Sequence, residues 1–289
     1  MVQNLNEAAD ILDRPHPASK GKCSPSWPSV NVLGVEVHPQ CMQQAVGRIA
    51  SWIGKRASTY VCVTSVHGII LCQDDANLRD IHNDAGMVTT DGMPLVWLSR
   101  RAGHATAERV YGPDFMLEVC SASREQGWRH FFYGGTDDVL LKLRNNLESA
   151  FPGLVIADAY APPFRSLSEA EDEAVVERIN AAKPDIVWVG LGAPKQERWM
   201  AAHLGRLKAP VMIGVGAAFD FHAGVKPQAP RWMQRNGLEW LFRMVTEPRR
   251  LAGRYLRCNT LFLWYLAQQR LGWRRFPITE NAVCGKAGT

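Results

Sequence analysis

The sequence predicts an α/β protein with a doubly wound, mostly parallel sheet of the Rossmann-like type, followed by a helical, arginine-rich C-terminal appendage. Two observations predict this class. From about residue 30 to residue 216, short runs rich in valine and isoleucine alternate with segments of helical periodicity, a rhythm typical of a parallel sheet covered by helices on both faces. From about residue 229 the rhythm stops, and the chain becomes helical in pattern, aromatic and rich in arginine.

The expected strands are short and apolar, and the expected helices fill the intervals between them. We expect a strand or hairpin at 30–37, and buried strands at 59–65, 87–90, 129–135, 154–160, 185–192 and 209–216. We expect helices at 40–55, 66–83, 93–101, 113–126, 136–150, 168–182 and 194–205. In the first of these helices the apolar side chains recur near helical spacing, at Met42, Val46, Ile49, Trp52 and Ile53.

The chain is expected to divide into four parts. Residues 1–28 carry four prolines among small and polar residues and are expected to form a mobile leader. Residues 29–228 form the α/β core, 229–275 the helical appendage and 276–289 a tail. The N-terminus has no apolar signal-peptide region, and no uninterrupted apolar stretch is long enough to span a membrane. The seven cysteines are scattered without a C-x-x-C pair, which fits reduced thiols in a cytosol.

The positive charge of the chain is concentrated in the appendage. The net charge is +5, but eight arginines and one glutamate lie between Arg243 and Arg275, so this segment carries +7 and the remainder −2. Such a block predicts an anionic partner, which could be phosphate groups, anionic lipid or nucleic acid.

Small and polar residues follow several expected strands, where a doubly wound sheet binds its ligands. Thr64, Ser65 and His67 follow the strand at 59–65. Gly134 and Gly135 stand between a strand and a helix, where the backbone either approaches a phosphate or forms a plain turn. No G-x-G-x-x-G fingerprint is present at this turn, which argues against an ordinary dinucleotide-binding oxidoreductase.

Three carboxylates and one amide at later strand ends are further candidates. Asp91 is either a general base or the N-cap of the helix at 93–101. Gln196 and Glu197 lie in the first helical turn after Pro194 and either hold sugar hydroxyls or, for Glu197, complement the helix dipole. Asp220 is either a base or sugar ligand, or a hydrogen-bonding centre of its loop.

Six ordered stretches carry a resemblance to a known family: DGMPLVWLSRR (91–101), RVYGPDFM (109–116), FFYGG (131–135), DIVWVGLGAPKQERWM (185–200), GVGAAFDFHAG (214–224) and APRWMQRNGLEWLFRMVTEPRRLAGRYL (229–256). Together they resemble the WecG/TagA/CpsF family of bacterial glycosyltransferases over residues 30 to 270. The resemblance implies an inverting transfer of a hexosyl group from a UDP-sugar to a polyprenyl-diphosphate-linked acceptor in the synthesis of cell-surface polymers. Glucose, N-acetylmannosamine and its uronic acid are all open as the donor sugar.

The resemblance also implies roles for single residues. Asp91 would be the catalytic base, and Arg109, Gln196 and Asp220 would line the pocket. One departure concerns the Thr-x-Asn pair that the family carries at the end of the second strand. Here that place has no asparagine, and Thr64 or Ser65, with His67 beside them, is expected to take its role. The sequence Ala-Pro-Pro-Phe at 161–164 is similar to the exopolysaccharide branch of the family.

We expect no metal ion and no cofactor. The histidines show no metal-ligand spacing, and no D-x-D pair is present to hold a divalent ion on a diphosphate. The charge of the leaving UDP would then be neutralised by arginines, whose planar fork binds two oxygens at once. The candidates are Arg231, Arg249, Arg250 and Arg254.

The basic appendage predicts where in the cell the protein lies, in addition to the phosphate groups that it is expected to bind. Its arginines alternate with tryptophan and leucine between residues 248 and 275, a pattern typical of helices that lie in the membrane interface. We therefore expect a cytoplasmic enzyme bound peripherally to the inner face of the cell membrane, with no nucleic acid partner; a homo-oligomer is open. Two alternatives stay open from the residues: another UDP-sugar enzyme, such as an epimerase, and a non-catalytic polyanion-binding protein.

Overall fold

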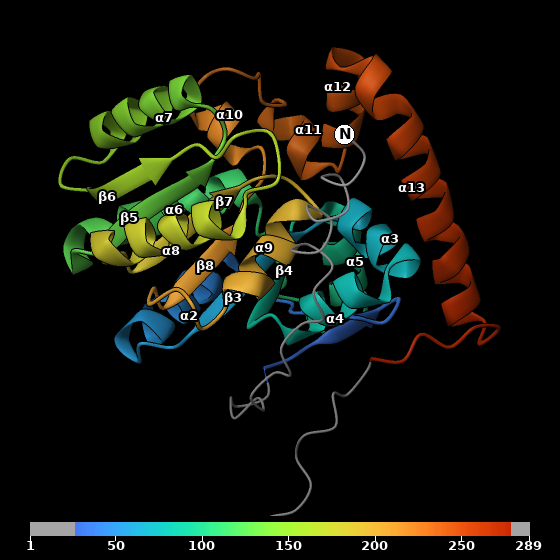
Figure 1. Ribbon diagram of the computed structural model, residues 1–289. Helices are drawn as coiled ribbons and strands as arrows, with labels where there is room; N and C mark the ends of the chain where they lie inside the picture. Colours follow the sequence, from blue (N-terminus) through green and yellow to red (C-terminus); the bar gives the residue numbers. More distant parts are fainter. Residues whose placement is uncertain (1–26, 279–289) are drawn as a thin grey trace, which may run out of the picture.

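The computed structural model describes residues 27–278 and contains one six-stranded parallel sheet between two layers of helices (Figure 1). The strands of this sheet are β3 (Thr59–Thr64), β4 (Met87–Thr90), β5 (Arg129–Gly134), β6 (Val155–Tyr160), β7 (Ile186–Gly190) and β8 (Val211–Gly214). Their order is β4-β3-β8-β7-β5-β6, and every neighbouring pair is parallel. A separate antiparallel hairpin is formed by β1 (Val30–Val32) and β2 (Val35–Val37).

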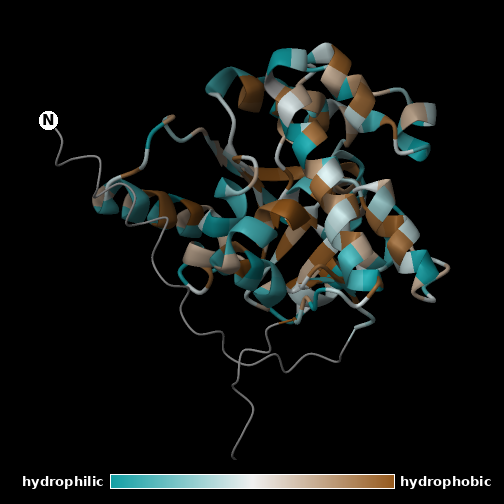
Figure 2. Ribbon diagram, turned by 90° about the vertical axis from the view of Figure 1, so that its right-hand side faces the viewer, coloured by the Kyte–Doolittle hydropathy of each residue, from teal (hydrophilic) through white to brown (hydrophobic). Residues whose placement is uncertain are grey.

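The sheet strands other than the half-buried edge strand β6 are largely buried, because both faces are covered. Between residue 27 and the appendage, the helices are α2 (Met42–Gly54), α3 (Val66–Asp74), α4 (Ala76–Asp84), α5 (Met93–Arg101), α6 (Gly112–Gln126), α7 (Asp137–Ala150), α8 (Glu169–Ala182), α9 (Lys195–His203) and α10 (Ala218–His222). One apolar core joins the sheet to α3, α4, α8 and α9, and the other joins it to α2, α6, α7 and α10. Coloured by hydropathy, the interior strands are brown, as buried parallel strands require (Figure 2).

The strand order fixes where a ligand can bind. The connection from β5 passes through α7 on one face, whereas the connection from β7 passes through α9 on the other face. The chain thus leaves these two neighbouring strands toward opposite faces of the sheet. Sheets of this type bind ligands in the crevice that opens beyond the carboxyl ends of such strands.

The appendage consists of α11 (Arg231–Arg235), α12 (Glu239–Thr246) and α13 (Pro248–Arg270). The long helix α13 runs alongside α3 (Figure 1) and buries Leu251, Cys258 and Phe262. The C-terminal end of α13 contacts the β1–β2 hairpin, where Gln269 accepts a hydrogen bond from the backbone N–H of Leu33. Within residues 27–278, no helix combines the length and the apolar composition that crossing a bilayer requires.

The predicted fold class is confirmed, and the elements differ from expectation in one instructive place. The helix expected at 66–83 is two helices, α3 and α4, separated at Asp75. Asp75 has extended backbone angles, and its carboxylate accepts a hydrogen bond from the N–H of Leu78, so it caps a new helix. The expected leader at 1–28 and tail at 276–289 fall almost entirely outside the described residues.

Candidate active site

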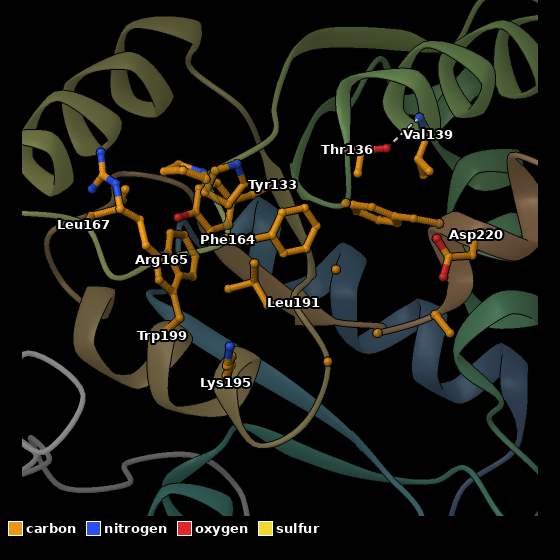
Figure 3. Close-up of a pocket in the computed structure, with 18 of the residues that line it drawn as sticks. Tyr133, Thr136, Val139, Phe164, Arg165, Leu167, Leu191, Lys195, Trp199 and Asp220 are labelled. Atoms are coloured by element: carbon orange, nitrogen blue, oxygen red, sulfur yellow. Dashed lines mark hydrogen bonds between the residues drawn. The ribbon is translucent and has the colours of Figure 1, made fainter. Parts of the chain in front are cut away.

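A cavity of about 760 Å³ lies at the carboxyl ends of β5, β7 and β8, at the crevice that the strand order predicts (Figure 3). Three groups of residues line it. The strand-end loops contribute Gly135, Thr136, Gly190, Leu191, Gly192, Gly216, Ala217, Phe219, Asp220 and Lys226. Helix and sheet side chains contribute Tyr133, Val139, Asp172, Lys195, Trp199, Ala202 and His203, and the loop after β6 contributes residues 162–167.

The ends of β5 and β7 lie in close contact beside this cavity. Gly134 has a φ of +123°, and a Cβ atom placed there would lie 2.7 Å from the carbonyl carbon and oxygen of Gly190. Only glycine fits both restrictions. The predicted Gly134-Gly135 turn is therefore a required approach of β5 to β7, and Gly135 itself lines the cavity.

Gln196 and Glu197 lie behind the cavity wall and are both buried. The amide oxygen of Gln196 accepts hydrogen bonds from the N–H groups of Gly192 (3.2 Å) and Gly216 (2.9 Å), which tie the loops after β7 and β8 together. Its amide nitrogen donates to Glu197 at 2.9 Å. Burial raises the pKa of Glu197 to about 7. The structure thus places these two side chains where they shape the wall, and neither is among the residues that line the cavity.

Aromatic side chains form one side of the cavity. The ring of Trp199 stacks on Tyr133 (4.3 Å between centroids) and on His203 (4.1 Å). His203 is held by Asp172 at 3.0 Å. At the mouth, Phe164 is 93% exposed on the loop after β6. Flat apolar surfaces with few polar groups are the usual lining of small-molecule sites.

Cationic groups and helix N-termini give the cavity an anion-binding character. Lys195 lines the cavity at the first turn of α9, and Lys226 donates to Asp220 at 2.6 Å. The N-termini of α7 and α9 also face it through Thr136 and Lys195. Because helix N-termini present free N–H groups and a partial positive charge, they favour phosphate.

Asp91 lies along the same edge of the sheet, at the end of β4. Its side chain is 22% exposed, and its Oδ1 atom is buried without a hydrogen-bond partner. The guanidinium of Arg109 is 3.9 Å from this oxygen. The pKa of Asp91 is raised to about 6 overall: burial raises it most, Arg109 and Arg243 lower it, and Glu239 raises it. A carboxylate with a pKa near neutrality, a buried oxygen and partial exposure is suited to accept a proton.

The end of β3 contributes a third group. Thr64 is buried, and its backbone oxygen accepts a hydrogen bond from the N–H of Asp91 at 3.1 Å. Ser65 and His67 follow at the start of α3. Burial, and then the charge of Arg254, lower the pKa of His67 to about 4. The structure therefore brings His67 and Arg254 together beside the strand that carries Asp91.

The other predicted arginines are placed differently. Arg231 is exposed and forms an ion pair of 2.7 Å with Asp114 on α6. Arg249 is exposed at the start of α13, and Arg250 follows it in the same helix. Neither Arg231 nor Arg249 lines the cavity, and the cations among its described lining residues are Arg165, Lys195 and Lys226.

Several residues of the site were missed from the sequence. Lys195 stands within the segment GLGAPKQE, and only its place on the cavity side of α9 distinguishes it from any surface lysine. Tyr111 and Glu239 are 128 positions apart and meet only in the fold, at 2.8 Å. Within residues 27–278, no group of three or more His, Cys, Asp or Glu side chains is arranged to hold a metal ion.

Comparison with known proteins decides the class of the enzyme. The model of the glycosyl transferase WecG/TagA/CpsF family matches residues 30–276. The chain belongs to this family. It is therefore a glycosyltransferase, which sets aside the epimerase-like and the non-catalytic alternatives.

Relatives with assigned activities come from Staphylococcus aureus. The chain is 27% identical over 243 residues to the N-acetylglucosaminyldiphosphoundecaprenol N-acetyl-beta-D-mannosaminyltransferases of strains NCTC 8325 / PS 47 and COL. The corresponding protein of strain MRSA252 is equally similar. Each alignment covers 83% of this chain and 93% of the relative.

Proposed function

We propose that this glycosyltransferase moves a hexosyl group from a UDP-sugar to a polyprenyl-diphosphate-linked acceptor, with inversion at the anomeric carbon and with Asp91 as the base. The observation that carries the proposal is Asp91 itself. It is a partly exposed carboxylate whose Oδ1 lacks a partner, on the edge of the sheet that also holds a nucleotide-sized cavity.

The cavity is the proposed donor site. A volume of about 760 Å³ is within the range of sites for small ligands. The aromatic wall of Tyr133 and Trp199 suits a flat base, and Lys195 with two helix N-termini suits a diphosphate. The strand β4, which Asp91 follows, and the strand β8, which leads into the cavity, lie two strand spacings apart in the sheet, about 10 Å. A nucleotide diphosphate bound in the cavity can therefore present its sugar to Asp91.

The proposed reaction is a single displacement. Asp91 accepts the proton of the acceptor hydroxyl, whose oxygen forms the new bond to C1 of the donor sugar. The bond between C1 and the diphosphate oxygen breaks, and UDP leaves with the electron pair. Lys195 and the N-termini of α7 and α9 stabilise the negative charge that develops on UDP. No step of this reaction requires a metal ion.

The appendage is the proposed membrane contact. The outward face of α13 carries Leu256 (74% exposed), Leu263 (66%) and Trp264 (53%), opposite the face that packs on the core. These positions repeat at helical spacing and are interleaved with arginines, and Figure 2 shows hydrophobic and hydrophilic residues alternating along the C-terminal helices. Such a face suits an anionic bilayer surface. We therefore propose a peripheral location on the inner face of the membrane, where a lipid-linked acceptor is found.

The donor and acceptor are tested directly with the purified protein. A panel of UDP-glucose, UDP-N-acetylmannosamine and its uronic acid is scored by thermal shift, and by transfer to a short-chain lipid diphosphate that carries N-acetylglucosamine. The names of the Staphylococcus aureus relatives make UDP-N-acetylmannosamine the first donor to test. Transfer with inversion, unchanged by a chelator, is expected for one donor. No transfer and no UDP-induced shift would contradict the proposal.

A further inference from the structure

The C-terminal appendage reaches the surroundings of Asp91 through one carboxylate, Glu239. Glu239 begins α12, and its side chain is nearly buried. Its Oε2 atom accepts a hydrogen bond from the guanidinium of Arg109, and its Oε1 atom accepts one of 2.8 Å from the hydroxyl of Tyr111. Both partners come from the segment before α6, so Glu239 joins the appendage to the core.

Arg109 lies near two carboxylates but forms a side-chain hydrogen bond with only one of them, Glu239. It donates from Nε to the backbone oxygen of Asp91 at 2.5 Å, which fixes the guanidinium next to that residue. Its terminal nitrogen is bonded to Glu239 and remains 3.9 Å from Oδ1 of Asp91, too far for a hydrogen bond. The ring of Tyr111 lies 3.9 Å from the guanidinium carbon and holds it from the side.

Competition for Arg109 has a direct chemical consequence. A carboxylate in contact with an arginine is stabilised as the anion and becomes a weaker base. Without Glu239, the guanidinium would need to move only by about one ångström to bond Asp91. With Glu239 in place, the Arg109 charge is shared, and the Oδ1 atom of Asp91 stays unbonded.

We infer that Glu239 is a positioning residue: by binding Arg109 it keeps the guanidinium off the Asp91 carboxylate, so that docking of the appendage completes the base. This inference rests on the proposed role of Asp91. It assigns the appendage a task in the chemistry that is separate from any contact with lipid.

The other groups around Asp91 are consistent with this task. Arg243, one turn further along α12, opposes the rise in the pKa of Asp91, and its guanidinium lies 5.4 Å from the ring centre of Phe221 on α10. The backbone N–H of Gly112 also favours the anion. His67 on α3 adds no charge near neutral pH, because its pKa is lowered to about 4. Among these charged neighbours, only Glu239 raises the pKa of Asp91.

The test is Glu239→Gln, which removes the charge but keeps the shape and an acceptor for Tyr111. The pH profile of kcat/KM is measured with a water-soluble acceptor, and the Asp91 carboxyl is titrated by carbon NMR, with Asp91→Asn to assign its signal. In the variant, the acid limb and the titration are expected to move to lower pH by about one unit. The plateau rate is expected to fall roughly 3- to 10-fold, because the base is weaker. Glu239→Asp should restore part of both.

Glu118→Gln, an exposed glutamate of α6, is the matched control and should change neither quantity. Thermal unfolding of each variant shows that it is folded. An acid limb and an Asp91 titration that stay at the wild-type pH in Glu239→Gln would overturn the inference. Failure of the proposed function is distinguishable, because in that case Asp91→Asn keeps its activity whether or not the Asp91 titration responds to Glu239.

Discussion

Arg109 donates a hydrogen bond of 2.5 Å to the backbone carbonyl of Asp91, yet its guanidinium stays 3.9 Å from the carboxylate of the same residue. The backbone bond fixes the end of β4 against the segment before α6. Oδ1 of Asp91 is left without a hydrogen-bond partner, and burial raises the pKa of this carboxyl to about 6. An arginine that anchors the backbone of a residue and leaves one oxygen of its carboxylate without a hydrogen bond is the arrangement on which the proposed chemistry depends.

Lys195 tests the donor site. Lys195→Ala removes a cation that lines the cavity, and we expect the Kd for UDP to rise roughly 5- to 30-fold, because a charge-assisted hydrogen bond at a partly exposed site is lost. Isothermal titration with UDP checks this. Lys142→Ala, on the surface of α7 and outside the cavity lining, is the control. Equal UDP affinity in both variants would place the diphosphate elsewhere.

Gly134 tests the approach of β5 to β7. In Gly134→Ala, the new Cβ atom would lie 2.7 Å from backbone atoms of Gly190, in addition to the strain of a φ of +123°. We expect a loss of about 1–3 kcal/mol or more in the free energy of unfolding, measured by chemical denaturation. Gly153→Ala is the control, since its φ is +93° but no atom lies within 4 Å of a Cβ placed there. A similar loss in both variants would mean that the strand approach contributes nothing.

The outward face of α13 tests the membrane contact. The triple substitution Leu256→Ser, Leu263→Ser and Trp264→Ser removes exposed apolar groups and leaves the buried face of α13 intact. We expect flotation with anionic liposomes to fall at least several-fold, while transfer to a water-soluble acceptor is kept. Leu141→Ser changes an equally exposed leucine on α7 and should leave flotation unchanged. Undiminished flotation of the triple variant would refute the membrane contact.

A truncation of the appendage would not separate lipid binding from folding. Removing the chain after Thr246 would also remove Leu251, Cys258 and Phe262, which are buried against the core, and Gln269, which binds the N-terminal hairpin. A truncated protein could lose activity simply by unfolding. Substitutions on the exposed face separate lipid binding from folding.

Much of the fold followed from local pattern. Strand-forming runs such as 59–65 and helices such as 136–150 are set by periodicity and flanking residues, which act over a few positions. The division of 66–83 into two helices depends on Asp75, whose carboxylate caps α4. Aspartate inside an apolar helical pattern does not by itself distinguish a cap from a surface residue, so this boundary was not predicted.

The site was predicted unevenly. Position at a strand end predicted Gly135 and Asp220, which line the cavity, and Asp91, which follows β4, because the carboxyl edge of a parallel sheet gathers such residues. The sequence did not predict the direction in which each of these side chains points. In the structure Gln196 lies behind the cavity wall and Arg231 forms an ion pair with Asp114, and their roles in ligand binding stay predictions. The contact of Glu239 with Arg109 was not predicted, because the two residues are distant in the chain and meet only when α12 packs on the core.

Asp91→Asn is the measurement that tests the central claim most directly. The substitution keeps the size of the side chain and removes its capacity to accept a proton. We expect kcat for transfer from the active UDP-sugar to fall roughly 100- to 10,000-fold, with an unchanged UDP-induced thermal shift and an unchanged unfolding temperature without ligand. A general base contributes at least about 100-fold to the rate. If the variant keeps more than about a tenth of the wild-type turnover, the loss is smaller than this contribution, so Asp91 is not the base and the proposed mechanism is wrong.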